Sequence, residues 1–318
     1  MDKFSLTEEL KYSPQGNPSL KPKQFGELAM AYEDCDTVPF LWQYAKNFTL
    51  YDHIFQQVTA PATPGNLVII GAQAGETLWL LHPDQAYQGN GNSGTGVPVL
   101  NDADPYWGSQ LDKTQNGKMP VNPGDFSGNP PKECATQINL TFATLPLTLT
   151  GKDVQAITQS DADPSGDLAD VQGNIPKIMQ TQTLDVPWSW YEEGFDKEPT
   201  DPKSADPVDA NGTHASYIAH HNGPQYFGYL ANNPKEASNM QGLEDLMTAL
   251  DKQTLPAQGG LFYVKGGYQN ILGLKPADPS PAVQKNFLGN DDHPAYSDAQ
   301  ISEAMVATII NKIARGPY

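Results

Sequence analysis

The stretch Leu261-Phe262-Tyr263-Val264 decides the fold class of this chain, because its consecutive residues are all apolar and glycines lie on either side of it. A strand with one solvated face alternates apolar and polar residues, whereas a strand in a parallel sheet covered by helices is apolar throughout. The stretch therefore predicts a β-strand in a sheet that is covered on both faces.

The clearest helix signal follows this strand, near the end of the sequence. Ser297-Asp298-Ala299-Gln300 has the form of a capping box, and Gly316-Pro317 ends the segment. Between these boundaries the apolar residues recur at helical spacing. We expect the helix to pack on the sheet through Ile301, Met305 and Ile309.

Helical patterns also occur at residues 243–250 and through most of residues 28–75. In the second region, Asp36-Thr37-Val38-Pro39 and Thr63-Pro64 are both helix starts, and Thr63 is the expected N-cap of the second. Leu67-Val68-Ile69-Ile70 is apolar on every face and should be buried. Helices that alternate with apolar strands predict an α/β fold, with a mostly parallel central sheet sandwiched by helices.

Residues 75–187 differ in texture, since Gly, Asn, Asp, Ser and Pro dominate them. Strand-like alternation occurs at Thr136–Phe142 and again at Leu145–Leu149. A loop-rich stretch of this length usually serves as a lid or a binding surface. We therefore expect a single domain over residues 1–318, with residues 75–187 as an insertion within it.

Composition restricts the partners of the chain. Its 318 residues include 19 Lys and Arg against 37 Asp and Glu, a net charge of −18. Nucleic acids and anionic membrane surfaces would be repelled, so neither is an expected partner. The sequence contains no apolar run of transmembrane length. Its two cysteines, Cys35 and Cys134, could form one disulfide or remain two unrelated thiols.

Histidines supply the first candidate site residues. His220 and His221 are adjacent and lead into Asn222-Gly223-Pro224, and imidazoles can donate to phosphate oxygens, act as acids or bind metal. The alternative is a solvated pair on a surface loop. His293 follows Asp291 and Asp292, whose carboxylates could orient its ring and stabilise its cationic form, unless the segment simply approaches the last helix.

Two segments resemble those of the bacterial phosphoesterase family, which includes phospholipase C and acid phosphatases. Asp292-His293-Pro294 is similar to its histidine segment, and Pro61-Ala62-Thr63-Pro64-Gly65 to its nucleophile loop, Gly-Pro-(Ser/Thr)-x-Pro. Ala62 stands where the attacking hydroxyl is expected. Other segments resemble the family in the same order: residues 1–4, 39–52, 61–71, 189–194, 221–227 and 297–318.

The resemblance implies an alkaline phosphatase-like α/β fold and a site for phosphate esters. It assigns the nucleophile position to Ala62, with Thr63 as a possible substitute, and phosphate-oxygen or leaving-group contacts to His221 and His293. It further implies a set of phosphate-binding residues: Gly65, Asn66, His220 and Asp292. A helix N-terminus suits such an anion because its amides and dipole are positive.

The family also implies a divalent metal, whose carboxylate and Glu-Asn ligand motifs are expected outside these residues, so the chain should correspond to the interior of a longer enzyme. The expected substrates are phosphomonoesters or phospholipid phosphodiesters. Family members are often periplasmic or secreted, although the first residues here have no signal-peptide pattern. Three interpretations remain: a hydrolase of weak or no activity, a non-catalytic protein that binds phosphate or a polar lipid, and a fragment without function.

Overall fold

The computed structural model describes residues 3–15, 17, 19–56, 61–74, 140, 142–150, 168–183, 186–195, 216–231, 233–281, 283–285, 289–293 and 297–318. It divides into two compact units. The first is Met1–Leu50 with Ala277–Ser280, and the second is Tyr51–Pro276 with Pro281–Tyr318.

The first unit contains helices α1 (Phe4–Tyr12), α2 (Leu20–Leu28) and α3 (Pro39–Asn47). The rings of Tyr12 and Phe25 lie 4.6 Å apart and hold α1 against α2. Gly26 permits this close approach, because a Cβ at that position would lie 2.7 Å from the carbonyl oxygen of Ser5. Pro39 occupies the first turn of α3, as the sequence predicts.

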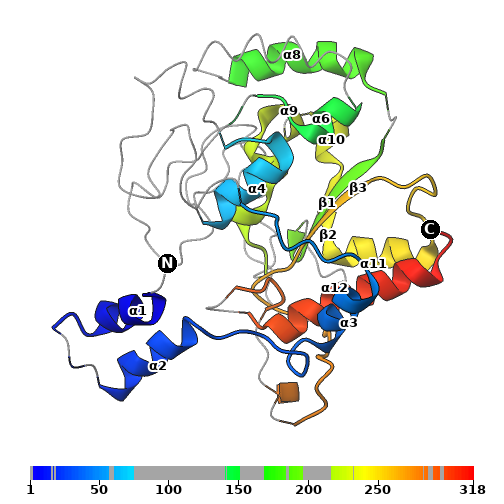
Figure 1. The fold of residues 1–318 in the computed structure, drawn as a ribbon. Helices are drawn as coiled ribbons and strands as arrows, with labels where there is room; N and C mark the ends of the chain where they lie inside the picture. Colours follow the sequence, from blue (N-terminus) through cyan, green and yellow to red (C-terminus); the bar gives the residue numbers. More distant parts are fainter. Residues whose placement is uncertain are drawn as a thin grey trace. The chain divides into compact units, whose positions relative to one another are not determined.

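A parallel sheet forms the centre of the second unit (Figure 1). Its strands are β1 (Trp188–Glu192), β2 (Met240–Gly242) and β3 (Leu261–Lys265), in the order β2-β1-β3. Both neighbours run parallel to β1, and Trp190 is in register with Met240 on one side and Tyr263 on the other. The predicted strand at residues 261–264 is therefore confirmed.

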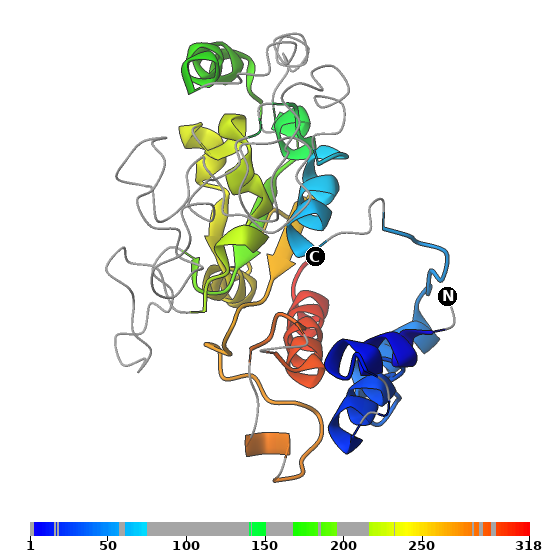
Figure 2. The same ribbon diagram turned by 90° about the vertical axis from the view of Figure 1, so that its left-hand side faces the viewer.

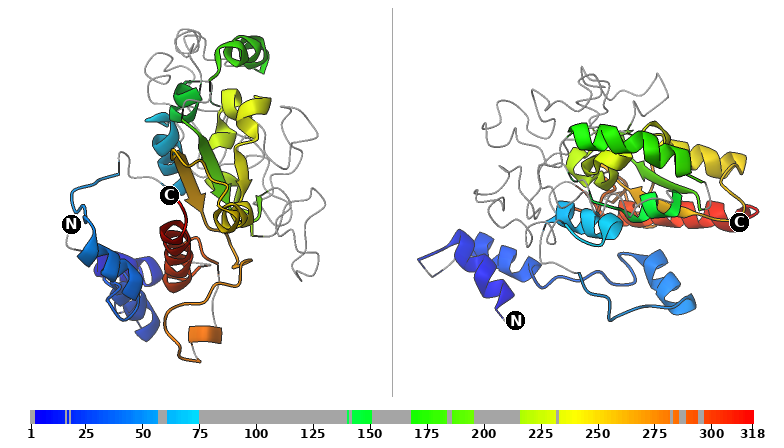
Figure 3. Two further views of the ribbon diagram at one scale, coloured as in Figure 1. Left: turned by 90° about the vertical axis from the view of Figure 1, so that its right-hand side faces the viewer. Right: turned by 90° about the horizontal axis from the view of Figure 1, so that it is seen from above.

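Helices cover both faces of this sheet, and Figures 2 and 3 show them on either side of the strands. On one face, Trp188 and Trp190 pack in a core with α4 (Ala62–Gly71). On the other face, Tyr191 packs with α11 (Leu243–Lys252) and with α12 (Ala299–Arg315). The side chains of β3 are half-buried rather than fully buried, because β3 lies at an edge of the described sheet.

The last helix follows the prediction closely. Met305 is buried against Tyr191 and the α11 core, Ile309 packs beside it, and Ile301 is fully buried. The N-cap is Asp298, whose carboxylate accepts a hydrogen bond of 2.9 Å from the Gln300 amide. The predicted capping box at Ser297 is therefore wrong by one residue. Ser297 instead uses its hydroxyl in contacts with the backbone of His293.

The predicted loop-rich insertion contains helices where it is described. Leu145–Leu149, expected as a strand, lies in helix α6 (Leu145–Thr150) because Thr144 caps it by accepting the Leu147 amide at 3.3 Å. Helix α8 (Leu168–Thr181) packs Ile175 and Ile178 into the core. Of the predicted strand at 136–142, Leu140 forms an isolated parallel bridge with Phe227, and residues 136–139 and 141 lie outside the described residues.

The short segments 219–221 (η5), 223–226 (η6), α9 (Gly228–Ala231), α10 (Pro234–Ala237) and 283–285 (η7) complete the described elements. Among the described residues, no helix combines the length and the apolar character that crossing a membrane requires.

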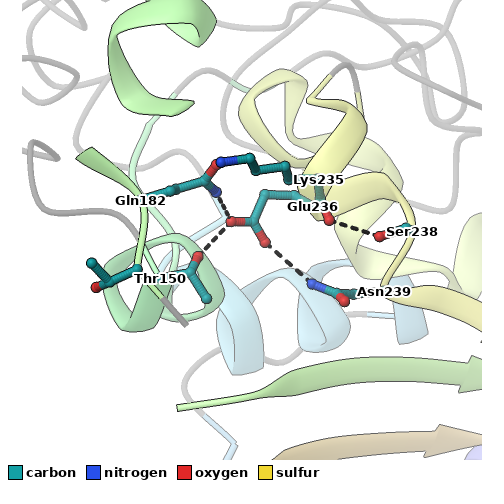
Figure 4. A pocket seen from close by; sticks show the side chains of 7 residues that line it. Thr150, Gln182, Lys235, Glu236, Ser238 and Asn239 are labelled. Carbon is teal, nitrogen blue, oxygen red and sulfur yellow. Dashed lines mark hydrogen bonds between the residues drawn. The ribbon is translucent and has the colours of Figure 1, made fainter. Parts of the chain in front are cut away.

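The buried carboxylate of Glu236, in α10, connects four segments of the second unit (Figure 4). It accepts hydrogen bonds from Thr150 and Gln182, from Trp188 Nε1 at 2.7 Å and from Asn239 Nδ2 at 3.4 Å. A cavity of about 370 Å³ adjoins it. Burial raises the pKa of Glu236, and the four donors oppose that shift.

We expect Glu236→Gln to lower the free energy of unfolding by about 1.5–3 kcal/mol, because one amide oxygen cannot accept from four donors. A raised carboxyl pKa means that the folded protein holds this proton more tightly than the unfolded chain, so this residue's stability contribution falls as pH rises above 4.5. Urea unfolding should therefore show a smaller loss at pH 8 than at pH 5. Exposed Glu27→Gln is the control, with an expected change below about 0.5 kcal/mol.

Candidate functional site

The candidate site lies where β1 and β3 end. In a parallel sheet the carboxyl ends of the strands share one edge, where α/β proteins commonly bind ligands. There β1 ends at Glu192 and β3 at Lys265, and these two residues are in register. The segments 62–66, 219–223 and 289–293 contribute the other residues of the site, through the contacts described below.

Helix α4 begins two residues earlier than a Thr63 cap would require. Its N-cap is Pro61, without a side-chain cap, and Ala62 is its first residue. The prediction that Thr63 is the N-cap is therefore wrong. The hydroxyl of Thr63 is fully buried and donates a 2.8 Å hydrogen bond to the backbone oxygen of His220. A contact across 157 positions of sequence thus takes the place of a local one.

The N-terminus of α4 is open around its first residues. Ala62 is exposed, and a Cβ added to Gly65 would meet nothing within 4 Å. Pro61 and Pro64 have no N–H group, so Ala62 and Thr63 carry the amides of the first turn. Gly65 lies one turn further in, where helix geometry places its amide in an intrahelical bond. Gly65 would therefore leave room for a ligand but would not donate a hydrogen bond to it.

The two adjacent histidines lie beside this helix end. His220 is half-buried and His221 is buried, and their rings meet edge to face at 4.6 Å. Gly223, two residues after His221, packs directly against α4. A Cβ on Gly223 would lie 3.2 Å from the backbone oxygen of Asn66 and would clash with Ile70. The hydrogen bond from Thr63 to His220 therefore joins the first turn of α4 to the histidine segment, and a shared site of Ala62, Thr63, His220 and His221 stays a prediction.

Several polar groups buried in this region lack a hydrogen bond of normal geometry within the described residues. They include both ring nitrogens of His221, both amide atoms of Asn222 and the Nδ2 of Asn66. Asn222 is fully buried and Asn66 is 7% exposed. A buried polar group without a partner costs about 1–3 kcal/mol, so donors such as these amides favour a site that takes up a polar ligand.

Asp291 contacts His221, in a segment remote from it in sequence. Its Oδ1 lies 3.4 Å from His221 Nδ1 and 3.4 Å from Lys265 Nζ, and its side chain is buried. Burial opposes the ionisation of Asp291, but His221 and Lys265 outweigh it and hold its pKa below the ordinary value. Burial lowers the pKa of His221, and Asp291 opposes that shift.

Two consecutive glutamates at the end of β1 are fully buried. Glu192 accepts the indole N–H of Trp190 at 2.9 Å, and burial raises its pKa well above the ordinary value. Glu193 accepts from Ser216 Oγ at 2.5 Å and from Asn290 Nδ2 at 2.7 Å. Asn290 also accepts the Gly267 amide at 2.8 Å, so Glu193 fastens residues 289–293 to the strand ends.

Sequence reasoning missed these anchors, although a signal was present. Acidic residues that directly follow the buried aromatic strand Trp188-Ser189-Trp190-Tyr191 must lie at the carboxyl edge of the sheet. Lys265 occupies the corresponding place after the apolar stretch at 261–264. Charged residues that directly follow a buried strand therefore indicate a candidate functional site at the carboxyl edge of the sheet.

The predicted residues Asp292 and His293 lie in the same segment as Asp291. Asp292 adopts a left-handed conformation with φ of 61°, and partial burial together with the charges of Asp291 and Asp298 raises its pKa. His293 is half-buried, and its backbone bonds to the Ser297 hydroxyl. That the His293 ring faces the N-terminus of α4 stays a prediction.

Potential metal ligands are not clustered among the described residues. Within the part of the chain that the structure describes, no three His, Cys, Asp or Glu side chains are grouped so that they could hold one. Asp291 is already shared between two cationic or donor side chains.

Comparison with known proteins identifies a family. The model described as the Phosphoesterase family matches residues 5–318, which is nearly the whole chain. A search of the curated proteins finds no match.

We expect Thr63→Val to lower the free energy of unfolding by about 0.5–1.5 kcal/mol, because the buried His220 oxygen would keep one donor, Tyr226 Oη at 3.3 Å. Amide hydrogen exchange at residues 219–221 should quicken as well. Thr254→Val is the matched control, since that exposed hydroxyl also donates to a backbone oxygen, of Ala249 at 3.3 Å. Equal effects of the two changes would contradict a special role of the hydrogen bond between Thr63 and His220 in stabilising residues 219–221.

Proposed function

Since the chain belongs to the phosphoesterase family, we propose that it binds the phosphate group of a phosphomonoester or of a phospholipid headgroup. The proposed position is the N-terminus of α4, beside residues 219–223. By lineage the domain is a phosphoric-ester hydrolase. We propose that this chain binds the phosphate group without hydrolysing the ester efficiently, as a non-catalytic relative of the hydrolases.

The observation that carries the proposal is the hydrogen bond from Thr63 Oγ1 to the His220 oxygen. It joins the segment that resembles the nucleophile loop to the segment that carries the histidines. The positive end of the α4 dipole and the amides of Ala62 and Thr63 favour an anion there. Buried amide donors of Asn66 and Asn222 add neutral hydrogen-bond donors for phosphate oxygens.

A chain with a net charge of −18 needs such a local arrangement, because the overall field repels phosphate. Among the described residues, Lys265 is the lysine at the strand ends, and its charge is paired with Asp291 at 3.4 Å. Helix amides and side-chain amides bring partial positive charge without attracting further carboxylates. This supports recognition of phosphate by dipoles rather than by full charges.

The covalent step of the family has no nucleophile here. Ala62 ends in a methyl group, so it cannot form a phosphoryl- or phosphatidyl-enzyme bond. Thr63 is an unsuitable substitute, because its hydroxyl is fully buried and donates to a backbone oxygen. These two observations favour the binding protein over the hydrolase.

We therefore expect hydrolysis of p-nitrophenyl phosphate and phosphatidylcholine at or near background, with or without added divalent metal. Both assays should be run on the unmodified chain and on Thr63→Val. Robust turnover that survives Thr63→Val would reveal another nucleophile or an activated water. Turnover that disappears in Thr63→Val would make Thr63 the nucleophile, and either result would overturn the proposal.

Binding can be tested separately from folding with Ala62→Asp. An aspartate at the first residue of a helix should stabilise it by about 0.3–1 kcal/mol, yet its charge should abolish phosphate binding at this position. Titration of inorganic phosphate followed by ³¹P NMR would measure the loss. Ala299→Asp makes the same change at the first residue of α12 and should leave phosphate binding unchanged. Binding that survives Ala62→Asp would place the phosphate elsewhere.

A further inference from the structure

The environment of His221 is asymmetric. Its side chain is 2% exposed, and Nδ1 faces the Asp291 carboxylate at 3.4 Å, which is longer than a typical N–H···O hydrogen bond. Its other nitrogen, Nε2, is buried and makes no hydrogen bond within the described residues. The two nitrogens of a neutral imidazole differ, since one donates and the other accepts. The residue beside Nδ1 therefore determines whether Nε2 donates or accepts a hydrogen bond.

Asp291 is held in place from two directions. Lys265 Nζ lies 3.4 Å from the same Oδ1 that faces His221. The preceding residue, Asn290, is fully buried and bonded to Glu193 and to the Gly267 amide. Gly266 allows this approach, because a Cβ there would run into the backbone of Asn290. The backbone that carries Asp291 is thus anchored to both strand ends, and Lys265 lies beside its carboxylate.

The charges around the ring determine its protonation. Asp291 and Lys265 face it, and His220 stacks against it edge to face. Burial lowers the pKa of His221, while its neighbours hold Asp291 ionised. Near pH 7 the ring is therefore neutral and lies next to a carboxylate. A neutral imidazole beside a carboxylate places its proton on the nitrogen that faces it.

We propose that Asp291 is a positioning residue that keeps the proton of His221 on Nδ1 and leaves Nε2 as a hydrogen-bond acceptor. The effect on ligand choice rests on the proposed function, namely phosphate binding at this site. An acceptor at Nε2 cannot donate to a bare oxyanion, but it accepts the O–H of a singly protonated phosphate. The site then selects the monoanion of a phosphomonoester over dianions such as sulfate, which carry no proton.

The tautomer can be measured on the unmodified protein, without any ligand. Long-range ¹H–¹⁵N NMR spectra distinguish a ring protonated on Nδ1 from one protonated on Nε2, and His221→Gln identifies the signals. We expect the Nδ1–H form in the wild type and in Asp291→Glu, and a shift toward the Nε2–H form in Asp291→Asn. An Nε2–H ring in the wild type would overturn the proposal, whatever the chain binds.

The consequence is tested with phosphoserine, whose second pKa is about 6, and with sulfate as the dianion without a proton. Affinity for phosphoserine should rise as pH falls from 7.5 to 6.5, a range in which the lowered pKa of His221 keeps the ring mostly neutral, and sulfate should bind at least tenfold more weakly at pH 6.5. Asp291→Asn should remove this preference, and Asp291→Glu should restore it. Equal binding of both anions would overturn the acceptor role. Binding of neither anion, with the Nδ1–H tautomer intact, would reject the proposed function and leave the tautomer assignment in place.

Discussion

The second unit depends on one constraint: β1 is hydrogen-bonded to a parallel neighbour on each side. Its two faces bury Trp188 and Trp190 against α4 and bury Tyr191 against α11 and α12. Each indole N–H then requires an acceptor, and Glu236 and Glu192 provide them. The hydrophobic strand thus determines where two buried carboxylates must lie.

These carboxylates are stabilised mainly by neutral donors. Glu236 has hydroxyl, amide and indole partners, and Glu192 has an indole. The next residue, Glu193, has a hydroxyl and an amide. Asp291 differs because it meets a lysine and a histidine, and it stays ionised. A buried charge of this kind is costly to isolate, so its two partners are held near it. That requirement connects the end of β3 to His221.

The same arrangement explains how a strongly acidic chain can offer a place for an anion. Lys265 is occupied by Asp291, so the proposed phosphate position relies on the α4 dipole and on amide donors. Ala62 gives that position a methyl group, and Thr63 turns its hydroxyl to the His220 backbone. The helix end thus offers the amides and the positive dipole end that an anion requires.

The sequence by itself determined the local elements and the family. Apolar runs and proline starts predicted β3, α3, α11 and α12, because burial and backbone chemistry act over a few residues. The order of short motifs gave the phosphoesterase resemblance, which the family comparison confirms. The helix at Leu145–Thr150 escaped prediction because a threonine cap outweighed its alternating pattern.

The tertiary structure alone decided the partners of the polar residues. Sequence position suggested a helix cap for Thr63 and a partner of His293 for Asp291, and the structure shows both in contact with the 220–221 segment. Buried hydrogen-bonding groups take whichever partner the packing brings close, and that partner is remote in sequence. Hydrophobic periodicity could therefore place the elements of this protein, but only the packed fold could assign its hydrogen bonds.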